Sequence, residues 1–177
     1  MIISKTKLEG CVIIEPTVFG DDRGFFLETF NCQRYHKLAN IDDSFVQDNH
    51  SRSSKNVLRG IHFQKTKPQG KLVRVVQGEV FDVAVDLRKS SATFGQWESV
   101  VLSGDNKKQF WIPPGFGHGF LVISDFADFE YKCTDYYDSN DEGSIIWNDS
   151  DLKISWPVKD PILSSKDKNA PSFKSYK

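Results

Sequence analysis

The sequence predicts an all-β protein, an antiparallel β-barrel or jelly roll with short peripheral helices. Short strand-like runs separated by turn signals fill most of the chain, as is typical of barrels and sandwiches. No low-complexity linker or internal repeat divides the 177 residues, which are enough for one domain with its own core. No dinucleotide, P-loop, nucleophile-elbow or HExxH motif is present. We therefore expect a single domain over residues 1–177, with its chemistry on individual strand residues.

The elements are predicted in chain order from periodicity and turn residues. Residues 24–30 (GFFLETF) are predicted to form a strand, and residues 32–38 a short helix. The later predicted strands are 45–51, 57–64, 71–76, 79–87, 97–103, 109–112, 119–123 and 129–136. Pro113-Pro114-Gly115 is a rigid turn between two of them. From about residue 149 the alternation is lost, and we expect this segment to wrap the barrel as loops and short helices.

The connection Gln77-Gly78 predicts a β-hairpin between residues 71–76 and 79–87. In that register Val76 pairs with Glu79, Val73 faces Asp82, and Lys71 lies opposite Ala84.

Composition narrows the class of protein. A net charge of −1 and a pI of about 6.4 give no reason to expect a nucleic-acid partner. The odd set of Cys11, Cys32 and Cys133 contains no CxxC pair and indicates reduced thiols. No apolar stretch approaches the length of a membrane span, so we expect a cytoplasmic protein without a membrane partner.

His62 is the first candidate for chemistry. It lies in RGIHFQ (59–64), and a lone strand histidine is usually a hydrogen-bonded core residue. Arg59 and Gln64 are close by, and Lys71 begins the next strand. Burying such cationic and polar side chains inside a barrel costs free energy, unless they are paired or take part in function. Arg59 and His62 have opposite parity, so a shared site requires a bulge, for which Gly60 is the natural place.

A metal centre is the main rival in a small barrel. It would require several His, Cys or carboxylate ligands at workable spacing. The histidines are His36, His50, His62 and His118, with no HxH pair among them. We therefore expect no metal.

Several other polar residues leave two interpretations open. Tyr131 and Tyr137 share a face if the strand continues through both, about 20 Å apart at most, which suits an elongated ligand or simple packing. The run QDNHSR (47–52) is typical of a solvated edge, Arg23-Gly24 of a turn, and SKDKN (165–169) of an exposed loop.

Taken together, the segments resemble the dTDP-4-dehydrorhamnose 3,5-epimerase family, the RmlC-type cupins. The resemblance extends from Arg23 to about Pro171. The motifs that carry it are DDRGFFLETF, FVQDNHSRS, LRGIHFQ, QGKLVRVVQGEVFDVAVDLR, WIPPGFGHGF, YKCTDYY, DEGSIIWND and LSSKDKNAP.

The resemblance implies roles for individual residues. His62 is the expected catalytic base, Tyr131 the proton donor across the sugar ring, Asp167 the carboxylate that pairs with the base, and Lys71 the lysine near the keto oxygen. The expected substrate-binding residues are Arg23, Glu28, Gln47, Asp48, Asn49, Arg59, His118, Tyr137, Glu142 and Lys166. Among these, the Tyr137 ring is expected to stack on thymine.

The implied activity is cofactor-free epimerisation at C3 and C5 of dTDP-4-dehydro-6-deoxy-glucose, giving dTDP-4-dehydro-L-rhamnose. The implied assembly is a homodimer that shares N-terminal strands. Four alternatives remain: a single-carbon epimerase, a 3,4-ketoisomerase, a nucleotide-sugar-binding barrel without activity, and a metal-dependent cupin oxygenase, which would lose activity to chelators.

Overall fold

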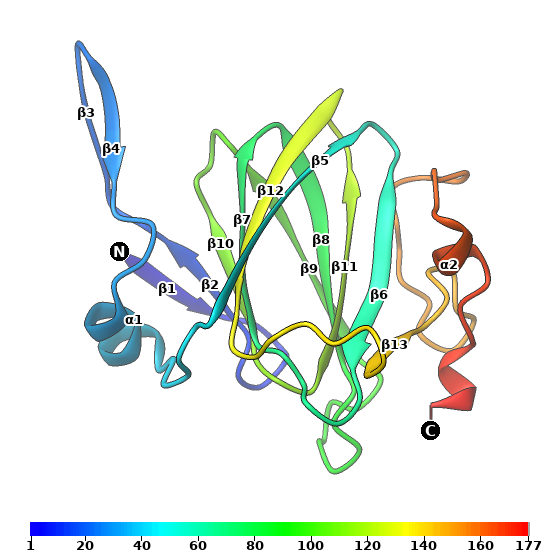
Figure 1. The fold of residues 1–177 in the computed structure, drawn as a ribbon. Coiled ribbons are helices and arrows are strands. Elements are labelled where there is room, and N and C mark those ends of the chain that lie inside the picture. Colours follow the sequence, from blue (N-terminus) through cyan, green and yellow to red (C-terminus); the bar gives the residue numbers. More distant parts are fainter. Residues whose placement is uncertain (177) are drawn as a thin grey trace.

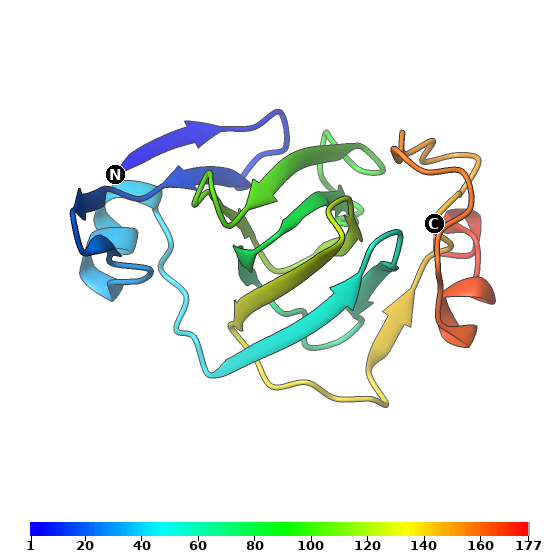
Figure 2. The ribbon, with the colours of Figure 1, turned by 90° about the horizontal axis from the view of Figure 1, so that it is seen from above.

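Two antiparallel sheets face each other and enclose the interior of a barrel in the computed structural model, which describes residues 1–176 (Figures 1 and 2). This confirms the predicted all-β fold. The six-stranded sheet has the order β1 (Ile2–Lys5), β2 (Val12–Glu15), β10 (Gln109–Ile112), β7 (Lys71–Gln77), β12 (Phe126–Cys133) and β5 (Gln47–Ser54). The five-stranded sheet has the order β13 (Glu142–Ser144), β6 (Leu58–Gln64), β11 (Phe116–Val122), β8 (Glu79–Asp86) and β9 (Trp97–Ser103).

The two remaining strands, β3 (Val18–Asp21) and β4 (Gly24–Leu27), pair only with each other. Figure 1 shows this hairpin projecting away from the barrel. Its strand β4 ends at Leu27, three residues before the predicted end. The helix that follows, α1 (Cys32–Ala39), confirms the predicted helix and is one residue longer. Asn31 caps its N-terminus by accepting a hydrogen bond from the Arg34 amide (3.1 Å).

Strand alternation divides the barrel residues into an inner and an outer set. On β8, Val80 and Ala84 pack in the interior cluster with Phe120 and Phe129, whereas Val83 faces a second cluster outside. Residues after β13 cover that outer face with Ile145, Leu152, Ile154, Trp156 and Phe173. The helices α2 (Ser165–Lys168) and η1 (Phe173–Ser175) belong to this covering segment (Figure 1).

The predicted hairpin at Gln77-Gly78 is wrong. Strand β7 pairs with β10 and β12 in one sheet, and β8 pairs with β11 and β9 in the other, so Val73 faces Phe110 and Tyr131 rather than Asp82. Gly78 has a φ of +80°, and a Cβ there would lie 2.0 Å from the Phe126 carbonyl oxygen. A tight glycine connection therefore turns a corner between sheets here instead of closing a hairpin.

The C-terminal limit predicted for the strand of Tyr131 is also wrong. Strand β12 ends at Cys133, so Tyr137 lies in the connection to β13 and not six residues along the same strand. Strand β11, by contrast, begins at Phe116, three residues earlier than predicted.

The bulge predicted at Gly60 is confirmed. On β11, His118 pairs with His62 and Phe120 pairs with Arg59, so β6 has one residue more than β11 between these pairs. Gly60 has a φ of +122°, and a Cβ there would lie 2.5 Å from the Cα of Gly119. The bulge changes the parity of the strand, so that Arg59 and His62 line the same cavity.

Asp86 provides a stability prediction at the end of β8. The buried carboxylate accepts hydrogen bonds from Arg88 (2.7 Å), Ser91 (2.6 Å) and Thr93 (2.6 Å). Burial raises the pKa of Asp86, but these hydrogen bonds outweigh it and lower the pKa to about 2. The stabilisation is complete above the unfolded pKa near 4 and is lost as the pH falls towards 2; it is worth about 2 kcal/mol. We expect Asp86→Asn to lower the Tm by roughly 4–8 °C at pH 7. Thermal unfolding checks this, and the difference from wild type shrinks as the pH is lowered towards 2; a difference that does not change with pH contradicts it.

Among residues 1–176, no helix is both long and apolar enough to cross a membrane.

Candidate active site

A histidine–aspartate pair links the barrel to the segment that wraps it. His62 on β6 places Nε2 2.6 Å from Oδ1 of Asp167 on α2, 105 residues away in sequence. Asp167 is 2 % exposed. Ser164, the N-cap of α2, donates its hydroxyl to Asp167 Oδ2 (2.8 Å) and accepts the Asp167 amide (3.0 Å). Packing of α2 against β6 thus fixes both oxygens of the carboxylate.

The pair also determines which nitrogen of His62 is basic. Burial raises the pKa of Asp167, but hydrogen bonds from His62 and Ser164 outweigh it, and the pKa lies below its ordinary value. Asp167 is therefore ionised at neutral pH and can only accept a hydrogen bond. Nε2 of His62 must carry a proton, which leaves Nδ1 with the free lone pair. His62 can take a second proton at Nδ1, and Asp167 stabilises the imidazolium that forms.

His62 lines two cavities, which we call the outer and the inner chamber; three residues, His62, Lys71 and Tyr131, line both. The outer chamber has a volume of about 240 Å³ and the inner one about 150 Å³. The outer chamber is lined by Gln47, Asn49, His62, Phe63, Gln64, Gln69, Lys71, Tyr131, Tyr137 and Glu142. The inner chamber is lined by Ser51, Arg59, His62, Lys71, His118, Phe120, Phe129 and Tyr131.

The shared residues come from opposite walls of the barrel. His62 belongs to the five-stranded sheet, whereas Lys71 and Tyr131 are on β7 and β12 of the six-stranded sheet. Figure 2, which looks at the barrel from above, shows the interior between these walls. A ligand between the sheets therefore has His62 on one side and Tyr131 on the other.

Burial shifts the pKa values of Lys71 and Tyr131, which line both chambers with His62, in opposite directions. It lowers the pKa of Lys71 below its ordinary value, although the charges of Asp82 and Glu142 act in the other direction. It raises the pKa of Tyr131, so the phenol keeps its proton at neutral pH. Tyr131 can therefore act as a proton donor, and Lys71 can hold or give a proton in the same space.

The inner chamber is bounded by a second histidine–aspartate pair. His118 lies directly opposite His62 in the β11–β6 register, and its Nε2 is 2.9 Å from Oδ2 of Asp82. Arg59 donates from Nε to the Ser53 hydroxyl (3.1 Å).

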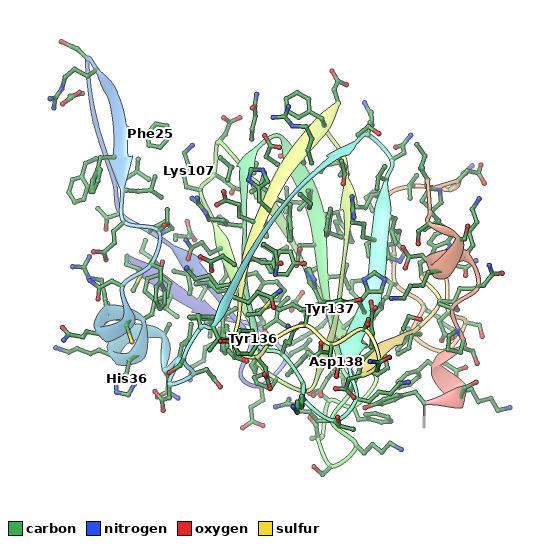
Figure 3. All side chains as sticks on the ribbon, viewed as in Figure 1. Phe25, His36, Lys107, Tyr136, Tyr137 and Asp138 are labelled. Carbon is green, nitrogen blue, oxygen red and sulfur yellow. The ribbon has the colours of Figure 1, made fainter. Side chains whose placement is uncertain are left out.

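A hydrogen-bonded group closes the outer chamber. The Tyr137 hydroxyl donates to Glu142 Oε2 (2.8 Å), and Lys166 forms an ion pair with the same carboxylate. Burial raises the pKa of Glu142, but Lys166 and Tyr137 outweigh it and lower the pKa. The Tyr137 amide donates to Gln47 Oε1 (2.9 Å). Figure 3 shows Tyr137 in front of the barrel, where this connection returns towards β13.

Three predicted binding residues lie elsewhere in the chain. Arg23 is at the tip of the β3–β4 hairpin, 89 % exposed and paired with Asp21. Glu28 follows that hairpin and pairs with Arg34 of α1 (3.0 Å). Asp48 is exposed and pairs with Lys132 (3.0 Å). One chain therefore brings eleven of the fourteen predicted residues to the chambers or the groups that bound them.

Two residues at the site were missed by sequence reasoning. Asp82 is an aspartate within an apolar strand, and its inward parity with Val80 and Ala84 was a usable signal. Ser164 had a weaker signal, as an N-cap residue three positions before Asp167. In the part of the chain that the structure describes, no group of three His, Cys, Asp or Glu side chains is placed to hold a metal ion.

Comparison with known proteins places this chain in a family. The family model described as dTDP-4-dehydrorhamnose 3,5-epimerase matches residues 5–175. The epimerase of that name from Salmonella typhimurium is 57 % identical over 97 % of this chain and 94 % of its own. The crystal structure of the 3,5-epimerase RmlC from Legionella pneumophila, in complex with dTDP-4-keto-L-rhamnose, is 56 % identical with a TM-score of 0.95 and covers 98 % of this chain and 93 % of that one.

A more distant structure, the 3'-monoepimerase ChmJ from Streptomyces bikiniensis in complex with dTDP-quinovose, is 34 % identical with a TM-score of 0.89 and covers 96 % of this chain and 86 % of that one. The family model covers residues 5–175, and the Salmonella relative, above half identity, matches 97 % of this chain. The chain belongs to the dTDP-4-dehydrorhamnose 3,5-epimerase family.

Proposed function

We propose that this protein is a dTDP-4-dehydrorhamnose 3,5-epimerase, which inverts C3 and C5 of dTDP-4-dehydro-6-deoxy-glucose. The observation that carries the proposal is the placement of His62, paired with Asp167, and of Tyr131 on opposite walls of a cavity that also holds Lys71. Epimerisation requires proton removal from one face of a carbon and proton return to the other. A base and an acid on facing sheets meet that requirement.

The chemistry makes Lys71 necessary. The hydrogens at C3 and C5 are alpha to the C4 ketone, so their removal as protons gives an enolate. A histidine near its reference pKa is a weaker base than that enolate by roughly a dozen units, a gap of about 16 kcal/mol. Donors aimed at O4 must stabilise the oxyanion, and we assign this task to Lys71, which lines both chambers together with His62. The ketone of the substrate is the electron sink, so the reaction needs no cofactor.

The outer chamber is the proposed site for the dTDP group. Tyr137 would stack on thymine, while Gln47, Asn49 and Lys166 supply polar contacts. We expect Tyr137→Ala to weaken dTDP binding by roughly tenfold to a hundredfold. The ring contacts the base in ground and transition state alike, so KM rises and kcat changes little.

Calorimetric titration with dTDP checks this, with Tyr136→Ala as the matched control. Tyr136 is adjacent, 65 % exposed and does not line either chamber (Figure 3). Equal weakening in both variants contradicts the stacking role.

We further propose that the protein works as a homodimer. The β3–β4 hairpin exposes Phe19 (62 %), Phe25 (60 %) and Phe26 (69 %), an apolar surface that a second copy would cover. In such a dimer Arg23 and Glu28 of one copy would reach the nucleotide site of the other. The three cysteines are free, which suits a reducing cytoplasm.

The experiment that tests the function is incubation with dTDP-4-dehydro-6-deoxy-glucose in D2O. The proposal predicts deuterium at both C3 and C5 of the product. Label at one carbon indicates a single-carbon epimerase, like the activity named for the Streptomyces relative, and a moved carbonyl indicates a ketoisomerase. Binding of dTDP without any label indicates a binding barrel. Each of these three results contradicts the proposal.

A further inference from the structure

Asp82 is a buried carboxylate on the inner face of β8, between the core residues Val80 and Ala84. It is 0 % exposed. Its Oδ2 bonds His118, but its Oδ1 has no hydrogen-bond partner among residues 1–176. A buried carboxylate oxygen without a donor is costly and calls for an explanation. The reaction described above does not use Asp82.

The negative charge of Asp82 balances positive charge on the walls of the inner chamber. Its walls carry two cations, Arg59 and Lys71, and two imidazoles, but no carboxylate. His62 and His118 are direct partners in the β-sheet register, so their Cβ atoms are about 5 Å apart. Asp167 bonds the first of these imidazoles from α2, and Asp82 bonds the second from β8. Each histidine of the chamber thus has its own buried aspartate.

We propose that Asp82 is a positioning residue of the epimerase reaction. Its hydrogen bond fixes the ring of His118, and its charge keeps Lys71 protonated in the buried chamber. The inference rests on the proposed function, in which protonated Lys71 stabilises the oxyanion at O4. The direction of the electrostatic effect agrees: burial drives Lys71 towards its neutral form, and the charge of Asp82 acts against it.

A purely structural ion pair is the alternative. In that case loss of Asp82 lowers stability, and activity falls only through unfolding. The two roles differ in the pH dependence of kcat, because only a role through Lys71 alters the pH at which that lysine loses its proton. The other titratable or charged groups that face Lys71 are Arg59, His62, His118, Tyr131, Cys133, Tyr137 and Glu142.

The test is Asp82→Asn, which keeps an oxygen acceptor for His118 and removes the charge. We expect kcat to fall at least about tenfold, as for other carboxylates that orient an imidazole. The basic limb of the kcat–pH profile moves to lower pH, because Lys71 then loses its proton more readily. Tyr131 does not obscure this limb, since burial raises its pKa above the ordinary value.

Two further variants serve as controls for Asp82→Asn. Asp86→Asn removes another fully buried carboxylate from the same strand, bonded to Arg88 and away from both chambers. It lowers the Tm but leaves the basic limb in place. Asp82→Glu retains the charge, so the basic limb stays at the wild-type pH. Its longer side chain displaces the hydrogen bond to His118, so kcat falls. All profiles are measured well below the Tm of each variant.

A basic limb that does not move in Asp82→Asn, or that moves equally in Asp86→Asn, overturns the inference. If Asp82→Asn does not fold, Asp82→Glu decides: a shifted basic limb in that variant contradicts it. Failure of the proposed function is distinguishable, because the wild-type protein itself would then give no deuterium at C3 or C5.

Discussion

Replacement of His62 by alanine abolishes deuterium incorporation at C3 and C5 and lowers kcat by about 10³-fold or more, because general-base catalysis alone contributes on the order of 10²–10⁴-fold. The variant also leaves Asp167 buried without its imidazole, which lowers the stability of the fold but is not needed for the loss of kcat. Exchange in D2O, followed by NMR, measures the loss.

Binding of dTDP separates catalysis from folding in this variant. The outer chamber keeps Tyr137 and Glu142, so the dissociation constant of dTDP stays close to that of wild type. His36→Ala is the matched control, because His36 is on α1, away from the barrel interior (Figure 3). Turnover at the wild-type rate in His62→Ala would remove His62 from the mechanism.

Replacement of Tyr131 by phenylalanine is expected to lower product formation by about 10²–10⁴-fold while the substrate still exchanges its proton. His62 and Lys71 remain in this variant, so the enolate forms and is reprotonated on the face from which the proton was taken. Inversion fails because the acid on the six-stranded sheet is missing. The measurement is the ratio of deuterium in recovered substrate to epimer formed.

Tyr176→Phe is the control for loss of a tyrosine hydroxyl. The Tyr176 hydroxyl donates to the Leu87 carbonyl (2.9 Å), and this ring packs in the cluster outside the five-stranded sheet. It leaves both exchange and inversion at wild-type levels. If Tyr131→Phe loses exchange and inversion in parallel, the two-sided mechanism is wrong, because Tyr131 would then serve proton removal itself.

The local pattern of the sequence was sufficient for α1, for the bulge at Gly60 and for most of the barrel strands, but it did not predict β1, β2, β3 or β13. Parity alone required that bulge, because Arg59 and His62 could not otherwise share a face. Local pattern was not sufficient for the connection at Gly78, since the same short glycine turn suits a hairpin and a corner between sheets. Which strands pair is decided by contacts far away in sequence, and no turn residue encodes them.

For the site, too, local sequence pattern identified some residues but not how they pair. The pairing of His62 with Asp167 spans 105 residues and came from family resemblance, not from spacing. Asp82 was visible as an inward charge in an apolar strand, but its partner His118 is on another strand, and only the structure joins them. That residues 1–177 form a single domain stays a prediction.

The proposed mechanism requires that His62 and Tyr131 act on opposite faces of the same sugar ring. A crystal structure with a dTDP-linked 6-deoxyhexose bound tests it most directly. We predict the Tyr137 ring on thymine, the sugar between the two sheets, the His62 imidazole on one face of the ring and the Tyr131 hydroxyl on the other. A sugar with both groups on one face, or one bound outside the chambers that contain His62, would contradict it.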